Sequence, residues 1–461
     1  MTEPGPSGPP EGSLKMLTRR RPDGRTVTAL LATSMVLVAG ASIGVAEGAV
    51  STANGATTEP HWGPVVTLAR AGQLSRPDVV VDEHGTETAA WSQSGSVVVT
   101  RRAAGGSWGS RVDLGQGSDP QLGIDRDGTV TIVWSRRLLG HGPQVMTARR
   151  PVPGHWSAGA ALSPAVAEGN GRGAFGPVLA VSRGGAVVVS WLWNEEDSGA
   201  AQAQARYRPA GGGWGASTTL SPLEAASPVC AIDARGRPVV AYVRQGSEFV
   251  VRRLAGSWGA PRLVGRHGEP PQVAVDDAGD IVVAWSQLQP DGIFRPVAAT
   301  RRVGGVWRAP VVLDATLDTP LTNTEPAVVM GPRGRSTVAW ARPDGQVMVA
   351  DHFLGGAWTP PSQVAPAGER VQPFPPALQL NVGRSGAALL SWTRETGTAM
   401  YVEAAYRPQA QGWQAPHRLS PLTVHAAAAE GFVRRGDRAV VVWRAVTTTP
   451  EDVVQLRRLH P

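Results

Sequence analysis

The sequence predicts an all-β protein, an eight-bladed β-propeller with four strands in each blade. Three observations lead to this prediction: two series of aromatic residues recur along the chain, each repeat carries a hairpin signal, and the two ends of the repeat region complement each other. The 461 residues include 56 Gly and 39 Pro, and 42% are hydrophobic. Many turns and a large apolar core therefore fit in one chain.

Two aromatic series define the repeat. The first places a Trp in front of an alternating segment: Trp62, Trp108, Trp156, Trp214, Trp258, Trp307, Trp358 and Trp413. The second ends an apolar run in each repeat: Trp91, Trp134, Trp191, Tyr242, Trp285, Trp340, Trp392 and Trp443. The spacing suits four short strands, which is the size of one propeller blade. We expect both series to pack between blades, each side chain burying on the order of 150–250 Å².

The order of strands is the same in each repeat. Strand one follows a proline, as at Pro77, and runs into a turn such as Asp82-Glu-His-Gly85. Asp can accept hydrogen bonds from the turn backbone and Gly supplies a positive φ, so this pattern predicts a tight hairpin. Strand two ends at the second aromatic series, and strand three carries a basic pair such as Arg101-Arg102. Strand four is expected to open on the first-series Trp, as at Trp108.

The ends of the repeat region predict how the ring closes. The region starts with a strand-four pattern at residues 61–68 and finishes with a strand-three pattern at residues 453–459. Together the two fragments complete one blade, which would remove the open sheet edges that invite aggregation. Eight blades is the direct count. A seven-bladed ring is the alternative, and it would require one repeat to form something else.

The chain ahead of the repeats predicts export. We assign residues 1–25 to a disordered N-terminus with a basic region, 26–46 to an apolar segment, 47–59 to a linker and 60–461 to the propeller. Basic residues followed by an apolar run and small residues are typical of a secretory signal peptide. An uncleaved membrane anchor is the alternative, because the apolar run is just long enough to span a bilayer. Both alternatives place the propeller outside the membrane, so we expect a secreted or extracellular protein.

Charge and cysteine content narrow the possible partners. The net charge is +7 and Lys15 is the single lysine, but the arginines recur evenly with 37 acidic residues between them. This distribution argues against a nucleic-acid-binding surface, which needs basic residues gathered on one face. Cys230 is the only cysteine and lies in an apolar run, so we expect a buried, unreactive thiol. We find no ligand spacing for a metal and expect no cofactor.

The repeated pattern V-A-V-D-x-x-G-x-x-V-V-A-W resembles secreted actinobacterial β-propeller repeat proteins of uncharacterised function, over essentially all of residues 60–461. More distantly it resembles the Asp-box hairpins of sialidase propellers. An Asp box reads S-x-D-x-G-x-T-W, whereas here two residues separate Asp from Gly and the Trp lies further on. Several repeats lack the Asp, with Ser182, Gly331 and Gly383 near that place. Such variation favours a structural role for the turn.

Strand order predicts which face of the ring carries a site. The two-to-three loops and the blade-to-blade connections share one face and vary most in length, so binding residues are expected there. Residues just before strand one should surround the mouth of the channel: Arg76, Asp119, Glu269, Glu325 and Glu430. The loops add Glu195, Glu196, Asp197, Asp291 and Arg295. Solvated loop ends without a ligand are the alternative interpretation of these charges.

Three functions remain open from the sequence. The first is an exported binding or scaffold protein, a monomer that presents its variable loops to an extracellular protein or glycan. The second is a lectin whose repeated Trp and Arg residues hold sugars. The third is a glycoside hydrolase of the sialidase type, using paired carboxylates. The sequence shows no convergent catalytic set, so we assign no catalytic residue, and an enzyme is the less favoured interpretation.

Overall fold

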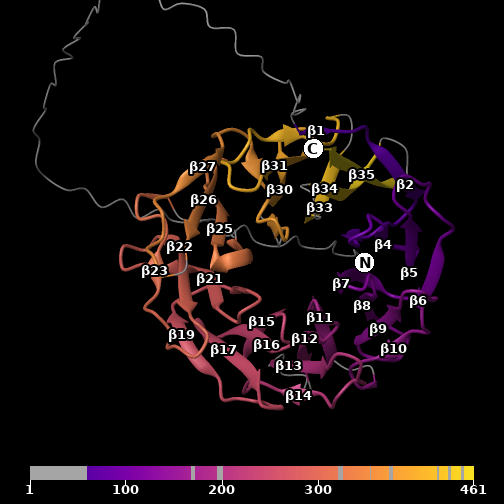
Figure 1. The fold of residues 1–461 in the computed structure, drawn as a ribbon, viewed down its shortest axis with the longest axis horizontal. Helices are drawn as coiled ribbons and strands as arrows, with labels where there is room; N and C mark the ends of the chain where they lie inside the picture. The colour runs from indigo at the N-terminus through magenta and orange to yellow at the C-terminus, as the bar shows by residue number, and fades with distance from the viewer. Residues whose placement is uncertain are drawn as a thin grey trace, which may run out of the picture. The chain divides into compact units, whose positions relative to one another are not determined.

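The computed structural model describes residues 60–460, except 168–171, 195–200, 320–324, 354, 373–376, 423–424, 434–437 and 448–450. Within these residues, 35 strands form eight antiparallel sheets arranged as a ring (Figure 1). Each sheet is one blade. The protein is therefore an eight-bladed β-propeller, as predicted, and the seven-bladed alternative is wrong.

Each blade begins with a strand next to the ring axis and continues with a second, longer strand. The innermost strands are β3 (Asp78–Val81), β7 (Ser118–Ile124), β11 (Gly173–Val181), β15 (Ala225–Ile232), β20 (Gln272–Val275), β24 (Ala327–Met330), β29 (Leu378–Val382) with the short β28 (Arg370–Val371), and β33 (His425–Val433). The second strands are β4 (Glu87–Gln93), β8 (Val130–Arg136), β12 (Val187–Asn194), β16 (Pro238–Arg244), β21 (Ile281–Leu288), β25 (Ser336–Ala341), β30 (Ala388–Glu395) and β34 (Ala439–Val446).

Two further strands complete each blade toward the outer rim. The third strands are β5 (Ser96–Arg102), β9 (Gln144–Arg150), β13 (Ala201–Arg208), β17 (Ser247–Leu254), β22 (Phe294–Arg301), β26 (Val347–His352), β31 (Met400–Arg407) and β35 (Asp452–His460). The outermost are β6 (Val112–Gln116), β10 (Ala160–Ala161), β14 (Thr218–Thr219), β18 (Ser257–Trp258) with β19 (Arg262–Arg266), β23 (Val311–Val312), β27 (Ser362–Ala365), β32 (His417–Arg418), and β1 (His61–Trp62) with β2 (Val66–Ala71). We number the blades 1 to 8 from β3 onward.

Blade 8 is built from both ends of the propeller region. Strand β1 pairs with β35 through His61–His460 and Trp62–Leu459, and β2 pairs with β35 from Val66 to Ala71. The outermost strands thus come from the start of the region and the other three strands from its end. This confirms the closure that the complementary end patterns predicted.

The hairpin turn between the first and second strands forms as its Asp and Gly predict. Asp82 Oδ1 accepts hydrogen bonds from the backbone N–H groups of His84 (2.9 Å) and Thr86 (2.7 Å), and Gly85 has φ of 88°. Asp125, Asp233 and Asp276 repeat this arrangement in blades 2, 4 and 5. One carboxylate therefore satisfies two turn donors that the hairpin would otherwise leave without partners.

The outermost strand begins four residues later than expected. Trp108 forms only an isolated bridge to Arg102, and β6 starts at Val112. The same interval separates every first-series Trp from a following outermost strand, as from Trp307 to β23, although Trp62 and Trp258 also lie in the short strands β1 and β18. Prolines such as Pro310 often occupy the intervening positions, and a proline cannot donate to a strand ladder. In the other six blades the Trp lies ahead of the strand, and Trp108, Trp307 and Trp358 form isolated bridges there.

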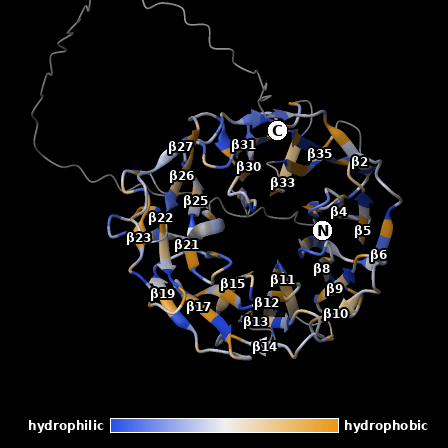
Figure 2. Cartoon of the chain, viewed as in Figure 1, coloured by the Kyte–Doolittle hydropathy of each residue, from blue (hydrophilic) through white to orange (hydrophobic). Residues whose placement is uncertain are grey.

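The hydrophobic core lies between the blades. The second aromatic series is 0–1% exposed in every blade, Tyr242 included, and each member belongs to a cluster that joins neighbouring sheets. Figure 2 shows hydrophobic positions recurring along the strands around the whole ring. The first-series Trp residues are half-buried at the outer rim. Inter-blade packing is therefore the role of the second series, as predicted.

Two single features complete the description of the fold. Cys230 is buried, and burial raises the pKa of its thiol to about 12, so the thiol stays protonated at neutral pH. Among the residues that the structure describes, no helix has the length and apolar character to cross a membrane.

The basic pair at the end of the third strand reaches both neighbouring blades. Arg102 pairs with Glu87 and Arg101 with Thr88, so the two side chains point to opposite faces of blade 1. Between blades 8 and 1, Glu87 accepts hydrogen bonds from Arg458 Nε and Nη2, both at 2.6 Å, and from Arg102 Nη1 at 3.4 Å. A buried carboxylate thus neutralises two arginines that meet at this junction.

Replacing Glu87 tests this junction. Glu87→Gln leaves Arg102 and Arg458 facing each other in a mostly buried place, so we expect a loss of about 3 kcal/mol in the free energy of unfolding. Urea denaturation at neutral pH measures this loss. The control is Asp127→Asn, which removes an exposed acid beside Arg126 and should leave stability unchanged. Equal stability of Glu87→Gln and the wild type would contradict a neutralising role for Glu87.

Glu248 on β17 interrupts an otherwise apolar repeat position. The equivalent residues of the other third strands are all buried and nonpolar: Val97, Val145, Ala203, Pro296, Val347, Val402 and Val454. Glu248 is fully buried against Gly265, Gly268 and the Trp285 ring, and neither carboxyl oxygen has a hydrogen-bond partner among the described residues. Burial, with a smaller effect from the charge of Glu269, raises the pKa of Glu248 to about 7.

Glu248 should make stability depend on pH. Because its pKa is raised in the folded state, the protonated form contributes stability that is present at low pH and is lost as the pH rises through about 7. Ionisation costs on the order of 3 kcal/mol. We expect Glu248→Val to remove this loss, so that it is more stable than the wild type at pH 8, measured by urea unfolding at pH 5 and 8. A wild-type pH dependence that persists in the variant would exclude Glu248 as its source.

Candidate functional site

A cavity of about 1000 Å³ lies on the ring axis. All eight innermost strands contribute to its lining, and one repeat position contributes from every blade. That position pairs with the residue just before the second-series aromatic, as Asp78 does with Ala90 and Gln379 with Ser391. The eight residues at this position are Asp78, Gln121, Val178, Val229, Gln272, Ala327, Gln379 and Glu430.

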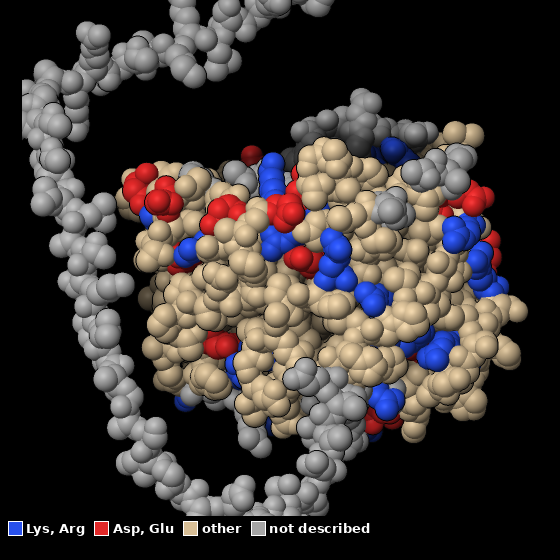
Figure 3. Space-filling model, turned by 90° about the horizontal axis from the view of Figure 1, so that it is seen from above, with Lys and Arg blue, Asp and Glu red and all other residues tan. Residues whose placement is uncertain are grey.

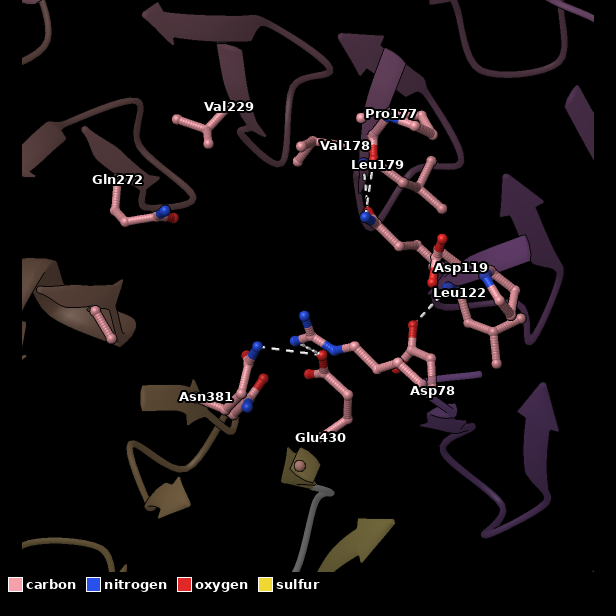
Figure 4. Close-up of a pocket in the computed structure, with 18 of the residues that line it drawn as sticks. Asp78, Asp119, Leu122, Pro177, Val178, Leu179, Val229, Gln272, Asn381 and Glu430 are labelled. Atoms are coloured by element: carbon pink, nitrogen blue, oxygen red, sulfur yellow. Dashed lines mark hydrogen bonds and ion pairs between the residues drawn. The ribbon is translucent and has the colours of Figure 1, made fainter. Parts of the chain in front are cut away.

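These eight residues give the cavity a polar side and an apolar side. Gln379, Glu430, Asp78 and Gln121 follow one another through blades 7, 8, 1 and 2. Val178 and Val229 lie across the cavity from Glu430 and Asp78 (Figure 4). A bound molecule would therefore meet hydrogen-bonding groups on one side and methyl groups on the other, as in many small-molecule sites.

Hydrogen bonds along the polar side join neighbouring blades. Arg76 forms an ion pair with Glu430, and Gln379 Nε2 donates to Glu430 Oε1 at 3.1 Å. Glu430 of blade 8 is thus held from blade 1 and from blade 7. These bonds fix the direction of the carboxylate before any ligand arrives, which is what preorganised binding requires.

The hydrogen bonds continue into blades 2 and 3. Asp78 Oδ2 accepts from the backbone N–H of Leu122 at 2.6 Å. Gln121 Nε2 donates to the Pro177 carbonyl at 2.8 Å, and Gln121 Oε1 accepts from the Leu179 N–H at 3.1 Å. On the far side of the ring, Gln272 Nε2 donates to Glu325 Oε2 at 3.0 Å. The polar lining therefore also stabilises the ring.

Bulges shape the rim of the cavity. In blades 2, 3, 4 and 8 the pairing of the innermost strand shifts by one residue, and the bulged residue has positive φ: Asp119 (53°), Gly176 (58°), Ser227 (46°) and Ala428 (57°). A bulge bends its strand and redirects nearby side chains. Asp119 reaches the cavity lining through such a bulge, with Ser118 Oγ donating to its carboxylate at 2.8 Å.

The cavity carries an excess of acidic groups. Its described lining contains four carboxyl groups, from Asp78, Asp119, Glu325 and Glu430, against the one guanidinium of Arg76. Burial raises the pKa of Asp78 to about 6, and burial together with the charge of Glu269 raises the pKa of Glu325. A positive charge beside these carboxyl groups would therefore stabilise their ionised forms and offset the cost of burying them.

The structure brings four of the predicted site residues together. Arg76, Asp119, Glu325 and Glu430 all line the axial cavity. Glu269 is exposed and outside this lining, although its charge acts on Glu325. That these five residues take part in binding stays a prediction.

The loop residues lie elsewhere. Asp291 and Arg295 form an ion pair of 2.7 Å with each other, and Arg295 also donates to the Leu317 carbonyl, so this pair is engaged locally and does not line the axial cavity. The predicted loop acids Glu195, Glu196 and Asp197 lie outside the described residues. In the parts of the chain that are described, no group of three His, Cys, Asp or Glu residues is placed to hold a metal ion.

Sequence analysis missed Asp78, Gln121, Gln272 and Gln379, which are four of the eight residues at the repeat position that lines the cavity. A signal was present: in three of these blades a polar residue directly follows the proline that starts strand one, at a position that is Val or Ala in other blades. The missing information was which face of the strand points to the axis, since side chains alternate along a strand.

Comparisons with known proteins identify no family for this chain. No family model matches the chain, and no curated protein sequence matches it. Similar solved structures include a polysaccharide lyase, an ulvan lyase (11% identity, 85% of this chain and 95% of that chain, TM-score 0.49). Another is the intramolecular trans-sialidase of Ruminococcus gnavus (9% identity, 75% of this chain and 94% of that chain, TM-score 0.42). A third is the Aleuria aurantia lectin (14% identity, 64% of this chain and 97% of that chain, TM-score 0.37).

Proposed function

We propose that this protein is an exported binding protein that holds a small hydroxylated organic cation, such as an amino sugar, in its axial cavity. The composition of the cavity carries the proposal: four carboxyl groups and one guanidinium, with carboxamides between them and valines opposite. Export rests on the basic and apolar N-terminal segment and belongs to the proposal.

The charge of the cavity favours a cation. A positive group beside Glu430, Asp78 or Asp119 would offset the excess of carboxylates, and charge-assisted hydrogen bonds are the stronger ones. Arg76 already occupies one such place through its ion pair with Glu430. Among the described residues, Asp119 accepts a hydrogen bond from its neighbour Ser118 and interacts with the charge of Arg76. Its exposed position leaves this carboxylate available to a ligand amine.

The shape and the polarity of the cavity favour a sugar ring over a linear amine. Carboxamides such as Gln379 and Asn381 can donate to hydroxyl groups and accept from them. Val178 and Val229 can contact the C–H face of a ring. A volume of about 1000 Å³ accommodates more than one sugar unit. The fully buried second-series Trp residues cannot stack on a sugar, which disfavours a lectin that uses them as repeated sites.

Calorimetric titration tests the proposal with glucosamine and its neutral analogue N-acetylglucosamine. We expect glucosamine to bind at one equivalent and N-acetylglucosamine to bind about tenfold more weakly. Asp119→Asn and Glu325→Gln should each weaken glucosamine binding by about tenfold. The control Asp277→Asn changes an exposed acid in a hairpin turn and should have no effect. Equal affinity for the two sugars, or no detectable binding of either sugar, would reject a cation site.

The pH dependence of binding gives a second prediction. Choline is the suitable probe because its own charge does not titrate. As the pH rises through about 6, Asp78 loses its proton, so choline affinity should increase between pH 5 and 7. Asp78→Asn should flatten this profile while the fold is retained, as checked by circular dichroism. An increase of the same size in the variant would assign the titration to another group.

A further inference from the structure

A second cavity, of about 540 Å³, lies at the outer part of the junction between blades 4 and 5. Arg252 and Leu254 of β17 form one wall together with Arg262 of β19. Arg301, Val306 and Trp307 of blade 5 form the other wall. Val306 is 85% exposed, so the groove opens to solvent. Three arginines and an aromatic ring thus surround one open space.

The same junction position elsewhere in the ring shows what this groove lacks. Arg301 pairs with Ile281 in blade 5, as Arg102 pairs with Glu87 in blade 1. Arg252 and Arg301 therefore correspond to Arg458 and Arg102, the two arginines that Glu87 neutralises between blades 8 and 1. Ile281 is fully buried and supplies no charge. The arginine pair is present here without its carboxylate.

The Asp residues of neighbouring turns do not take the place of that carboxylate. Asp233 is the acid whose charge acts on Arg252, but its Oδ2 accepts from Arg237 Nε at 2.5 Å and its Oδ1 accepts two backbone N–H groups. Arg252 Nε and Arg301 Nη1 are buried and have no hydrogen-bond partner in the described parts of the chain. Burial and the charge of Arg301 both lower the pKa of Arg252.

Arginine pairs at the same position also meet between blades 1 and 2 (Arg101 and Arg150) and between blades 2 and 3 (Arg149 and Arg208), where the second strands supply Val130 and Val187 instead of a carboxylate. Other junctions place a carboxylate or an aromatic ring beside an arginine. Between blades 6 and 7, Asp351 accepts from Arg407 Nη1 at 3.0 Å and from Arg335 Nη2 at 2.8 Å. Between blades 3 and 4, Arg253 lies over the Tyr207 ring with 4.4 Å to its centroid. A carboxylate or an aromatic face thus compensates Arg407, Arg335 and Arg253. The arginine pair between blades 4 and 5 borders an open cavity that also contains the Trp307 ring, and no carboxylate belongs to the described lining of that cavity.

We propose that the groove between blades 4 and 5 binds a small organic anion, with its carboxylate or sulfonate between Arg252 and Arg301 and a flat apolar body against Trp307 and Val306. Guanidinium groups bind such planar or tetrahedral oxyanions through paired hydrogen bonds. Arg262 adds a third positive charge at the edge of the groove. This site is separate from the axial cavity and takes a ligand of opposite charge, so it does not depend on the proposed function.

Titration of the full chain with naphthalene-2-sulfonate tests the site, with naphthalene-2-sulfonamide as the uncharged analogue of the same shape. We expect the sulfonate to bind at one equivalent and the sulfonamide to bind at least about tenfold more weakly. Arg252→Gln and Arg301→Gln should each weaken sulfonate binding by about tenfold. Both variants remove a like-charge contact, so they should fold at least as stably as the wild type.

Arg253→Gln is the matched control. It removes the same charge from the adjacent residue of β17, but Arg253 faces Tyr207 of blade 3 instead of the groove. Sulfonate affinity should therefore stay within about twofold of the wild type. The proposal is overturned if the sulfonate does not bind, if the sulfonamide binds as well, or if Arg253→Gln weakens binding as much as Arg252→Gln.

Thermal unfolding in sodium sulfate supplies an independent measurement. Sulfate stabilises most proteins by exclusion from their surface, and binding in the groove would add to that effect. We expect the midpoint of the wild type to rise more with sulfate than the midpoints of Arg252→Gln and Arg301→Gln. An equal rise in the wild type and in both variants would count against anion binding between these arginines.

Discussion

The packing of one buried aromatic side chain per blade against the neighbouring sheet is the contact on which the rest of the ring depends. Seven Trp residues and Tyr242 occupy this position and are almost completely inaccessible to solvent. Because each large ring fixes the distance between two sheets, eight such contacts determine how far the innermost strands lie from the axis. The axial cavity is thus a consequence of how the aromatic side chains pack between the blades, farther from the axis than the cavity itself.

Within this common packing, the residue types at equivalent positions determine the polarity of the cavity lining and the charge balance of each junction between blades. At the inner position, Asp78 and Glu430 give charge where Val178 and Val229 give apolar surface. At the end of the third strands, arginines meet across the junctions, and one residue of the second strand, Glu87 or Ile281, decides whether they are neutralised from within the chain. Figure 3 shows basic and acidic side chains interleaved over one side of the ring. The binding properties of the ring are therefore set by residue differences between blades and not by the fold that the blades share.

Sequence patterns predicted the features that depend on neighbours in the chain. The Asp82 turn, the second-series Trp residues and the complementary ends all follow from short motifs and their spacing. Features that depend on register could not be predicted in the same way. Glu87 and Arg458 are 371 residues apart, and their contact follows from closure of the ring together with alternation along β35. The late start of β6 after Trp108 likewise depends on which backbone groups can pair.

The candidate site was predictable only in part for the same reason. Arg76 and Glu325 lie just ahead of innermost strands and Asp119 lies near the start of β7, and that place in the chain was enough to suggest them. Glu430 was suggested for the same reason, but it lies inside β33. Gln121 lies inside β7 and Gln272 begins β20, and one residue of register decides whether such a side chain points to the axis or into the adjacent blade. Bulges such as the one at Asp119 shift that register in blades 2, 3, 4 and 8.

The pairing of β1 and β2 with β35 means that the start and the finish of the propeller region are neighbours in one sheet. The blade at which the chain starts is then incidental to the arrangement of the blades in space, because the ring is closed. If the two ends were joined and the chain were reopened at another connection between blades, every strand pair could be kept. A circularly permuted gene could therefore encode the same ring, and the eighth blade would become one held together by local connections alone.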